Sequence, residues 1–263
     1  MNETNQTTAP LKPLPMWQAG FLFGTPAFLF VFATYVVQPF LVARGASEFV
    51  GYLWAYLGGH LTLFVAALMA YRLEGNALTW PAFLSRFRLN TLGKRAWLWI
   101  IAVLAASYTL YGLLITGTRL AIDNGLLVIP QWVPPVIDPR LSFNSDFAHR
   151  VFGDKAQGDW SILVLLLIVH FFNIIGEEFW WRGYILPRQE LTHGKWTWVV
   201  HGTLWAMFHI PQWWTIVATL PLALLLSLMA QRLRSTWPGI ITHSLMNLPG
   251  QLALVVAVIV GAI

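Results

Sequence analysis

Two neighbouring glutamates stand at the end of a long apolar run. Glu177 and Glu178 directly follow residues 162–176, which carry no charged side chain. Charged groups at membrane depth are costly unless they are paired, and by default they mark a functional site. A helix that simply ended in solvent at Glu177 is the plainer interpretation, but the residues that follow are too aromatic for a free surface. Because Pro187 is the first helix breaker, we expect the helix to continue to about Leu186 and to hold both glutamates inside the protein.

Helical geometry separates the roles of the two carboxylates. Glu178 and Arg182 are four residues apart on one helix face, in the order that favours an ion pair, so we interpret them as a structural pair. Glu177 lies about 100° away around the helix and shares its face with Asn173, one turn before it. We therefore predict that Glu177 is the reactive group, that it faces a polar groove, and that Asn173 supports it.

Two later apolar regions each bring polar groups of their own. His209 follows Trp205 by one helical turn, and His243 and Asn247 share one face at i and i+4. A lone histidine in a membrane often makes only an interhelical hydrogen bond. Polar pairs in three consecutive charge-free regions instead favour one shared site, with Trp205 as a supporting residue. Three further histidines without such a pattern are interpreted as packing or supporting residues: His60, His170 and His201.

The composition requires that membrane-embedded elements position these groups. Only 10% of the 263 residues are charged and 57% are hydrophobic, whereas an ordinary soluble domain has about 25% charged residues. This excludes a water-soluble globular enzyme and a disordered chain. The chain has no cysteine, which excludes disulfides, thiolate nucleophiles and cysteine-bound metals. The net charge of +5 could suggest nucleic acid, but basic loops more often set the orientation of a membrane protein, so we predict no nucleic-acid partner.

Stretches without Asp, Glu, Lys or Arg locate the membrane spans, because about 20 apolar residues cross the hydrocarbon core. Six charge-free runs lie at 13–43, 49–71, 96–118, 160–176, 196–231 and 235–263. The fifth run is long enough for two short helices. We therefore predict an all-α fold, a polytopic membrane helix bundle of about seven transmembrane helices, with a range of six to eight. The last run contains Pro249-Gly250, so it fits either one kinked helix or two segments.

The basic loops predict how the helices are oriented. The segment 79–95 is rich in Arg and Lys, and basic residues at 188–195 and 232–234 fall on the same side of the predicted bundle. Loop 117–159 mixes acidic with basic residues and contains four prolines, so we predict a largely irregular, non-cytoplasmic loop. We expect a multi-pass protein of the cell membrane whose N-terminus is cytoplasmic.

The same features divide the chain into three parts. We separate a polar N-terminal tail (1–15), N-terminal transmembrane helices (16–159), and a C-terminal set of helices (160–263) that carries the polar residues. Segment 79–95 mixes large apolar residues with basic ones, which favours a short helix in the cytoplasmic interface over a plain solvated loop. In such a helix Trp80, Phe83 and Phe87 are shielded, and Arg86 is accessible.

The polar residues also form three ordered motifs that resemble those of a known family. Glu177-Glu178-x-x-x-Arg182, Trp205-x-x-x-His209 and His243-x-x-x-Asn247 are similar to the motifs of the CPBP family. These are intramembrane endopeptidases described as CAAX prenyl protease 2-like or as abortive-infection proteins. The resemblance covers roughly residues 160–250 and makes 160–263 the CPBP-like catalytic helices. The family's second motif usually begins with Phe, and we expect Trp205 to fill the same packing role.

The resemblance implies hydrolysis of peptide bonds in membrane-proximal or lipidated protein substrates, or in peptide precursors, with membrane lipids around the enzyme. In this interpretation Glu177 activates a water and His209 shares that water and protonates the leaving amine. His243 and Asn247 donate hydrogen bonds to the oxyanion. We expect these four catalytic residues to converge on one water-accessible cavity that opens toward the cytoplasmic leaflet.

Other mechanisms and functions fit the same residues. Glu177, His209 and His243 form a two-histidine, one-carboxylate set that could hold a catalytic zinc. We prefer the version that needs no cofactor, because the resemblance favours glutamate-dependent hydrolysis. A proton- or ion-coupled transporter could use the three groups as a relay, although the paired repeats typical of transporters are missing. A non-catalytic immunity or interaction protein that binds a partner in the same groove is a further alternative.

Overall fold

The computed structural model describes residues 8–141, 145–152 and 158–260, and within these ranges it contains helices and connecting segments but no β-strand. In chain order the helical segments, with π and 3-10 segments written η, are α1 (Met16–Phe32), η1 (Ala33–Val37), α2 (Gln38–Ala43), α3 (Glu48–Leu73), α4 (Trp80–Arg86), α5 (Lys94–Asp123), η2 (Pro135–Ile137), α6 (Ser145–Phe152), α7 (Trp160–Glu178), η3 (Phe179–Ile185), α8 (Leu186–His193), η4 (Gly194–Trp196), α9 (Thr197–Phe208), η5 (Ile210–Thr215), α10 (Ile216–Leu233) and α11 (Trp237–Val260).

The helices match the charge-free runs of the sequence. Among the described residues, five continuous helical stretches are long and apolar enough to cross a membrane: Met16–Ala43, Glu48–Leu73, Lys94–Asp123, Trp160–Phe208 and Ile210–Leu233. The fourth has 49 residues, more than twice a crossing length, and contains both α7 and α9. The final run forms the single 24-residue helix α11, in which Pro249 is an interior residue. The prediction of an all-α, polytopic membrane bundle is confirmed.

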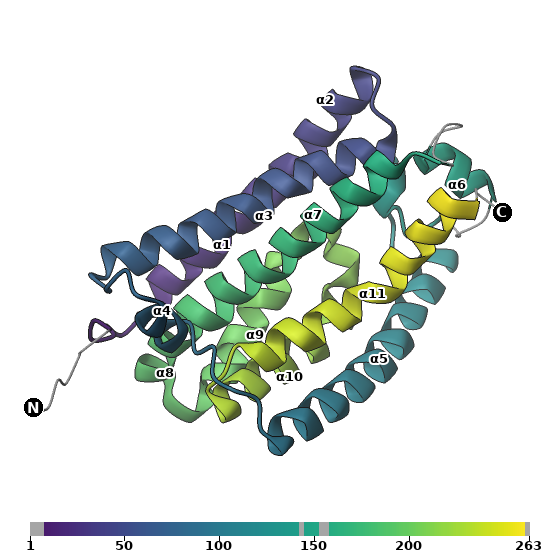
Figure 1. Cartoon of the computed structure of the whole chain (residues 1–263). Helices are drawn as coiled ribbons and strands as arrows, with labels where there is room; N and C mark the ends of the chain where they lie inside the picture. Colours follow the sequence, from purple (N-terminus) through teal and green to yellow (C-terminus); the bar gives the residue numbers. More distant parts are fainter. Residues whose placement is uncertain (1–7, 142–144, 153–157, 261–263) are drawn as a thin grey trace, which may run out of the picture.

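Long helices pack side by side and leave two distinct ends. Figure 1 shows α3, α7 and α11 next to one another, with α5 along the other side of α11 and α9 and α10 behind them. Helices α4 and α8 lie at one end, which we call the basic end because α5 begins there with Lys94 and Arg95. Helix α6 lies at the other end, which we call the α6 end.

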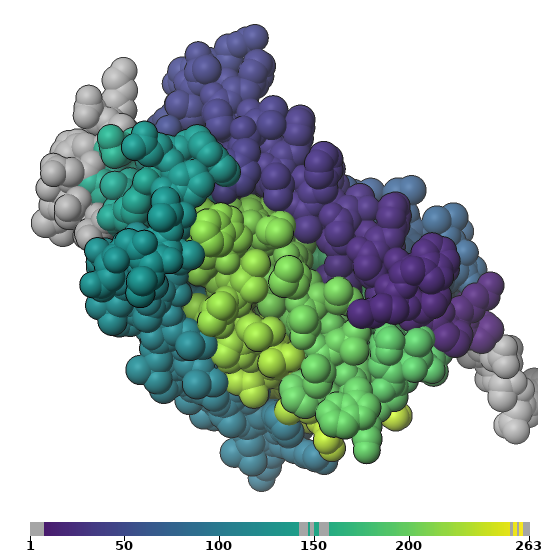
Figure 2. Space-filling view, turned by 180° about the vertical axis from the view of Figure 1, so that it is seen from behind, coloured from purple at the N-terminus to yellow at the C-terminus, as the bar shows by residue number. Residues whose placement is uncertain are grey.

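The outer surface of the bundle is apolar, as a lipid-facing surface must be. Large side chains that are more than half exposed occur on several long helices: Phe21 and Phe28 on α1, Leu113 on α5, Leu167 on α7 and Val217 on α10. On the rear face, α9 and α10 lie between α1 and the segment that follows α5 (Figure 2). That segment packs onto η5, where Trp214 contacts Ile129 and Val133.

The helix that carries the two glutamates runs further than expected. It does not end near Leu186, because the π segment η3 follows α7 directly and α8 then continues to His193. Pro187 is tolerated since it lies in the first turn of α8, where the missing N–H is not needed. Single π turns within helices occur frequently at functional sites.

Segment 79–95 contains a short helix, α4, but its side chains differ from the expected exposure at Arg86 and Trp80. Arg86 is not accessible: it is 4% exposed. Its Nη2 donates to the Glu74 carboxylate at 2.7 Å, and its Nη1 donates to the Gly183 carbonyl oxygen at 2.7 Å. Phe87 is buried as expected, whereas Trp80 is exposed on the protein surface. Arg86 points inward because its guanidinium N–H groups donate both to the Glu74 carboxylate and to a backbone carbonyl of the π segment.

Two further boundaries differ from the expected ones. Helix α5 extends to Asp123, and η2 and α6 lie within the loop that was expected to be largely irregular, so only parts of 124–159 are irregular. Residues 142–144 and 153–157 of that loop lie outside the described residues, as do residues 1–7 of the tail. The described part of the tail is docked: Leu14 is fully buried, and its backbone N–H donates to the Arg188 carbonyl oxygen at 3.2 Å.

Candidate active site

Glu177 is a buried carboxylate with several hydrogen-bond donors around it. The residue is 3% exposed. Its Oε2 accepts from the indole N–H of Trp205 at 2.9 Å and from that of Trp181 at 3.3 Å. Its Oε1 accepts from Asn173 Nδ2 at 3.4 Å, and His60 Nε2 lies 3.4 Å from the same oxygen. The carboxylate is therefore held in one orientation by neighbours from three helices.

Trp205 does more than the packing role expected of it. Its N–H bonds Glu177, and the Arg182 guanidinium lies over its ring, 4.0 Å from the centroid. The rings of His209 and His243 meet it edge-on at 5.0 and 5.4 Å. A phenylalanine would supply the aromatic face but no N–H, so the residue in which this chain departs from the family pattern contacts the predicted base directly.

Glu178 forms the pair expected from the helix spacing and a second contact that was not expected. Arg182 Nη1 donates to Glu178 Oε1 at 2.9 Å, and both side chains are fully buried. His243 Nδ1 also lies 3.0 Å from Glu178 Oε1. Because a carboxylate only accepts, His243 must carry its proton on Nδ1, which leaves Nε2 free to accept or, once protonated, to donate. Glu178 is therefore a structural anchor that also orients a predicted catalytic histidine.

Close packing of α11 against α7 depends on a glycine. A Cβ added to Gly239 would collide with Glu178 Oε2, closer than real Cβ contacts allow. Gly239 precedes His243 by one turn of α11, so the absence of a side chain there lets the histidine approach the glutamate.

His209 presents an unprotonated nitrogen. Its Nδ1 lies 2.9 Å from the Trp205 carbonyl oxygen, which only accepts, so Nδ1 carries the proton. The neutral imidazole therefore has its lone pair on Nε2, the form that can accept a proton. His209 follows the end of α9 and lies at the turn into η5, where the backbone leaves the helical path at Gln212.

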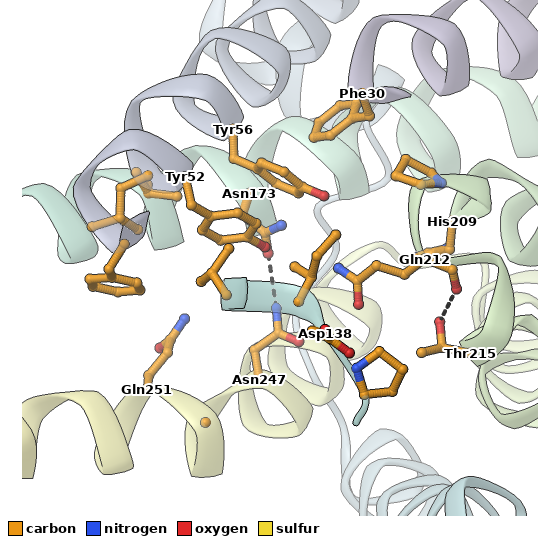
Figure 3. A pocket seen from close by; sticks show the side chains of 18 of the residues that line it. Phe30, Tyr52, Tyr56, Asp138, Asn173, His209, Gln212, Thr215, Asn247 and Gln251 are labelled. Atoms are coloured by element: carbon orange, nitrogen blue, oxygen red, sulfur yellow. Dashed lines mark hydrogen bonds between the residues drawn. The ribbon is translucent and has the colours of Figure 1, made fainter. Parts of the chain in front are cut away.

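A chain of polar side chains links three helices next to Glu177. Asn247 Nδ2 on α11 donates to Asn173 Oδ1 on α7 at 2.9 Å, a contact drawn in Figure 3. Asn173 Nδ2 in turn lies 2.7 Å from His60 Nε2 on α3. The sequence predicts only a packing or supporting role for His60, because no partner stands near it in the sequence. The contact could not be foreseen from spacing, since it joins residues 113 positions apart.

The four predicted catalytic residues line one cavity of about 640 Å³: Glu177, His209, His243 and Asn247. Figure 3 shows Asn173 and Asn247 facing one another within it, with Tyr52 and Tyr56 on the α3 side and Gln212 beside η5. The lining extends to Arg119 and Asp138 at the α6 end. The opening of the cavity toward the cytoplasmic leaflet stays a prediction. The buried residues Trp181, Arg182 and Leu186 fill the basic end beyond Glu177.

The zinc alternative does not fit this arrangement. Among the described residues, no group of three His, Asp or Glu side chains is placed so that it could hold a metal ion. We derive no step through a metal, and the catalytic role of the four residues stays a prediction.

Comparisons with known proteins identify the part of the chain that carries the site. The family model described as type II CAAX prenyl endopeptidase Rce1-like matches residues 159–249. The matched segment contains all three motifs, from Glu177 to Asn247, and excludes His60. Neither the comparison with curated proteins nor the comparison with solved structures finds a match. Within a helical membrane protein, residues 159–249 are thus similar to the Rce1-like type II CAAX prenyl endopeptidases, which supports the resemblance carried by the three motifs and implies a protease with peptide or protein substrates.

Proposed function

We propose that this protein is an intramembrane endopeptidase in which Glu177 activates the attacking water. The observation that carries the proposal is a buried carboxylate that lines the same cavity as the lone-pair nitrogen of His209. Both groups can accept a proton from a water between them, which is the requirement for general-base catalysis. The matched family supports the reaction class, and the arrangement of the side chains supports the assignment of roles.

The first step forms a tetrahedral intermediate. Water transfers a proton to Glu177 while its oxygen attacks the carbonyl carbon of the scissile bond. The negative charge that develops on the carbonyl oxygen needs donors that are already in place. Asn247 offers the N–H that is not engaged with Asn173. His243 offers Nε2 in its protonated form, and the Glu178 carboxylate at Nδ1 stabilises that imidazolium.

The second step breaks the C–N bond. The leaving nitrogen takes the proton that came from the water, either from Glu177 or through His209. The new carboxyl group and the new amine leave the cavity, and Glu177 returns to its ionised form. The proton that Glu177 takes from the water ends on the leaving amine, so these side chains account for every proton transfer in the cycle.

The cavity favours a peptide substrate close to the membrane. Its volume lies within the range of ligand-binding pockets. Its walls combine aromatic side chains such as Tyr52, Tyr56 and Phe208 with carboxamides such as Asn173 and Asn247. Aromatic walls suit apolar side chains, and carboxamides can bond a peptide backbone. We propose membrane-proximal or lipidated protein segments as the substrate class.

The test uses purified protein in liposomes and two matched pools of quenched fluorescent peptides, one farnesylated and one unmodified. Mass spectrometry identifies the bonds that are cut. Wild-type protein is expected to cut internal peptide bonds, with faster turnover of the farnesylated pool, and Glu177→Gln is expected to cut none. Glu190→Gln is the matched control, since Glu190 pairs with Arg88 outside the cavity. Equal cleavage by wild type and Glu177→Gln would overturn the proposal.

A further inference from the structure

His60 approaches the predicted base from outside the family segment. It lies on α3, whereas the matched residues begin at 159. His60 is 3% exposed, and its Nε2 is 3.4 Å from Glu177 Oε1. Within the described residues, it is the one basic side chain found within 4.0 Å of the Glu177 carboxylate. A residue outside the catalytic motifs therefore occupies the position of a counter-ion.

Helices α3 and α7 approach each other closely next to His60 because Gly176 has no side chain. A Cβ added to Gly176 would lie 2.6 Å from the His60 carbonyl oxygen, so only glycine lets the two helices come this close. The His60 ring is then enclosed by Phe30, whose ring centroid is 4.8 Å away, and by Tyr56 at 5.8 Å. Packing of this kind fixes the ring next to the carboxylate.

A buried carboxylate needs a positive partner more than it needs further neutral donors. Taking a charge out of water is energetically costly, and unpaired charges at membrane depth are avoided. The two indoles and the Asn173 amide donate to Glu177 but carry no charge. His60 is the neighbour that can supply a positive charge by taking up a proton.

Other titratable or charged groups surround the pair but do not replace it. On α3 these are Tyr52 and Tyr56, on α7 His170 and Glu178, on η3 Arg182, after α9 His209, and on α11 His243. Arg182 is committed to Glu178 and to the Trp205 ring. His243 is committed to Glu178, and His170 bonds Ser244 and Gln251.

We propose that His60 is a positioning residue which, when protonated, pairs with Glu177 and keeps it ionised between turnovers. The proposal rests on Glu177 being the base. His60 keeps its proton throughout the cycle, so the proton taken from water still passes from Glu177 to the leaving amine. His60 also sets the orientation of Asn173. A neutral Nε2 accepts from the Asn173 amide, whereas a protonated Nε2 requires the amide to turn its oxygen toward the ring.

That turn reverses the next contact in the chain. With its oxygen toward His60, Asn173 presents its NH2 group to Asn247, whose own oxygen must then accept. Both N–H groups of Asn247 become free for the oxyanion. The turn also removes the Asn173 donor from Glu177 Oε1, and the positive charge of His60 takes its place. Protonation of His60 thus supplies the counter-ion of the base and frees the oxyanion donor.

The first test compares His60→Gln with wild type in a pH–rate profile of peptide cleavage. Glutamine keeps hydrogen bonding but cannot take up a proton. Without the positive neighbour Glu177 is ionised only at higher pH, so the acid limb of kcat should move upward by about one unit. This lowers kcat about tenfold on that limb, with KM unchanged. His201→Gln is the control, because His201 is equally buried and bonds Gln189 without contacting Glu177. An unshifted limb in His60→Gln would overturn the proposal.

The second test needs no substrate. Infrared difference spectra between wild type and Glu177→Gln isolate the Glu177 carboxylate band. The intensity of this band is then followed against pH in the wild-type protein and in His60→Gln. His60→Asn replaces His60→Gln if that variant does not fold. The band should persist to lower pH when His60 is present, and equal titration would contradict the pairing. If Glu177→Gln keeps full activity, the proposed function fails while this titration still decides the pairing. If Glu177→Gln is inactive and both His60 measurements match wild type, only the pairing fails.

Discussion

The indole of Trp205 joins Glu177 and Arg182, two of the three charged groups of the first motif. Its N–H donates to Glu177 Oε2 at 2.9 Å, and the guanidinium of Arg182 lies 4.0 Å from its ring centroid. A cation over an indole face is stabilised by the ring's quadrupole, and the N–H in the ring plane is free to bond an anion. One side chain thereby holds the carboxylate predicted to react and the cation that neutralises its neighbour Glu178.

Trp205→Phe should keep the packing and lose the hydrogen bond to Glu177. A hydrogen bond to a charged group contributes about 1.5–3 kcal/mol, so kcat/KM should fall by roughly 10- to 100-fold in cleavage assays. Trp180→Phe is the matched control, since the Trp180 N–H bonds the Leu22 carbonyl oxygen and not Glu177. Wild-type activity in Trp205→Phe would show that the indole N–H has no part in holding the base.

Glu178→Gln and Arg182→Gln should both lose stability before they lose activity. Each leaves a fully buried charge without its partner, and breaking a buried pair costs about 3–5 kcal/mol. Thermal unfolding in one detergent should show a large decrease in Tm for both variants. The structure adds a difference between them: Glu178→Gln also removes the anion at His243, so the folded fraction of that variant should be less active than that of Arg182→Gln. A wild-type Tm in both variants would contradict the structural role of the pair.

Gly239→Ala should disturb the position of Glu178 by steric overlap. The added methyl group would collide with the Glu178 carboxylate, and strain of this kind in a packed interior costs about 1–3 kcal/mol. Gly58→Ala, on an open face of α3, should instead leave Tm unchanged or raise it slightly. Thermal unfolding of the two variants side by side measures the difference, and equal Tm values would argue against the close contact.

Removal of metal ions should leave cleavage unchanged. The proposed mechanism uses Glu177, His209, His243 and Asn247 alone, so incubation with a strong zinc chelator, followed by dialysis, should not lower kcat. Loss of activity that zinc restores would support the alternative in which two histidines and Glu177 share an ion. Elemental analysis of the purified protein provides an independent check.

Much of the fold follows from simple properties of the sequence. The charge-free runs locate the long helices because burial in lipid excludes charge over the whole length of a span. The i, i+4 spacing of Glu178 and Arg182 is a local property of one helix, so it predicts their contact. The same logic places Asn173 next to Glu177, and the structure has that contact at 3.4 Å.

Contacts between distant helices could not be predicted in this way. His60 meets Glu177 because Gly176 lets two helices approach, which no spacing within α3 reveals. The pairing of His243 with Glu178 depends on the rotation of α11 about its axis. Arg86 turned inward because carbonyls of a π segment needed donors, and a π turn has no clear sequence signal.

The depth of the site also depended on where helices end. If Glu177 ended its helix at the membrane surface, it would lie far from His209. Instead helical structure continues through η3 and α8, 15 residues beyond Glu178 to His193, and α9 has only 12 residues. At about 1.5 Å per residue, this continuation moves Glu177 inward, and the short α9 ends at the same cavity.

In the proposed mechanism, Glu177 removes a proton from the attacking water. The most direct measurement is the single-turnover rate of peptide cleavage by Glu177→Gln, with peptide binding measured on the same preparation. The amide keeps the size of the side chain but cannot act as the base. In this variant peptide binding and Tm should persist while the rate falls to background. A Glu177→Gln variant that cleaves bound peptide at the wild-type rate would contradict the proposed mechanism.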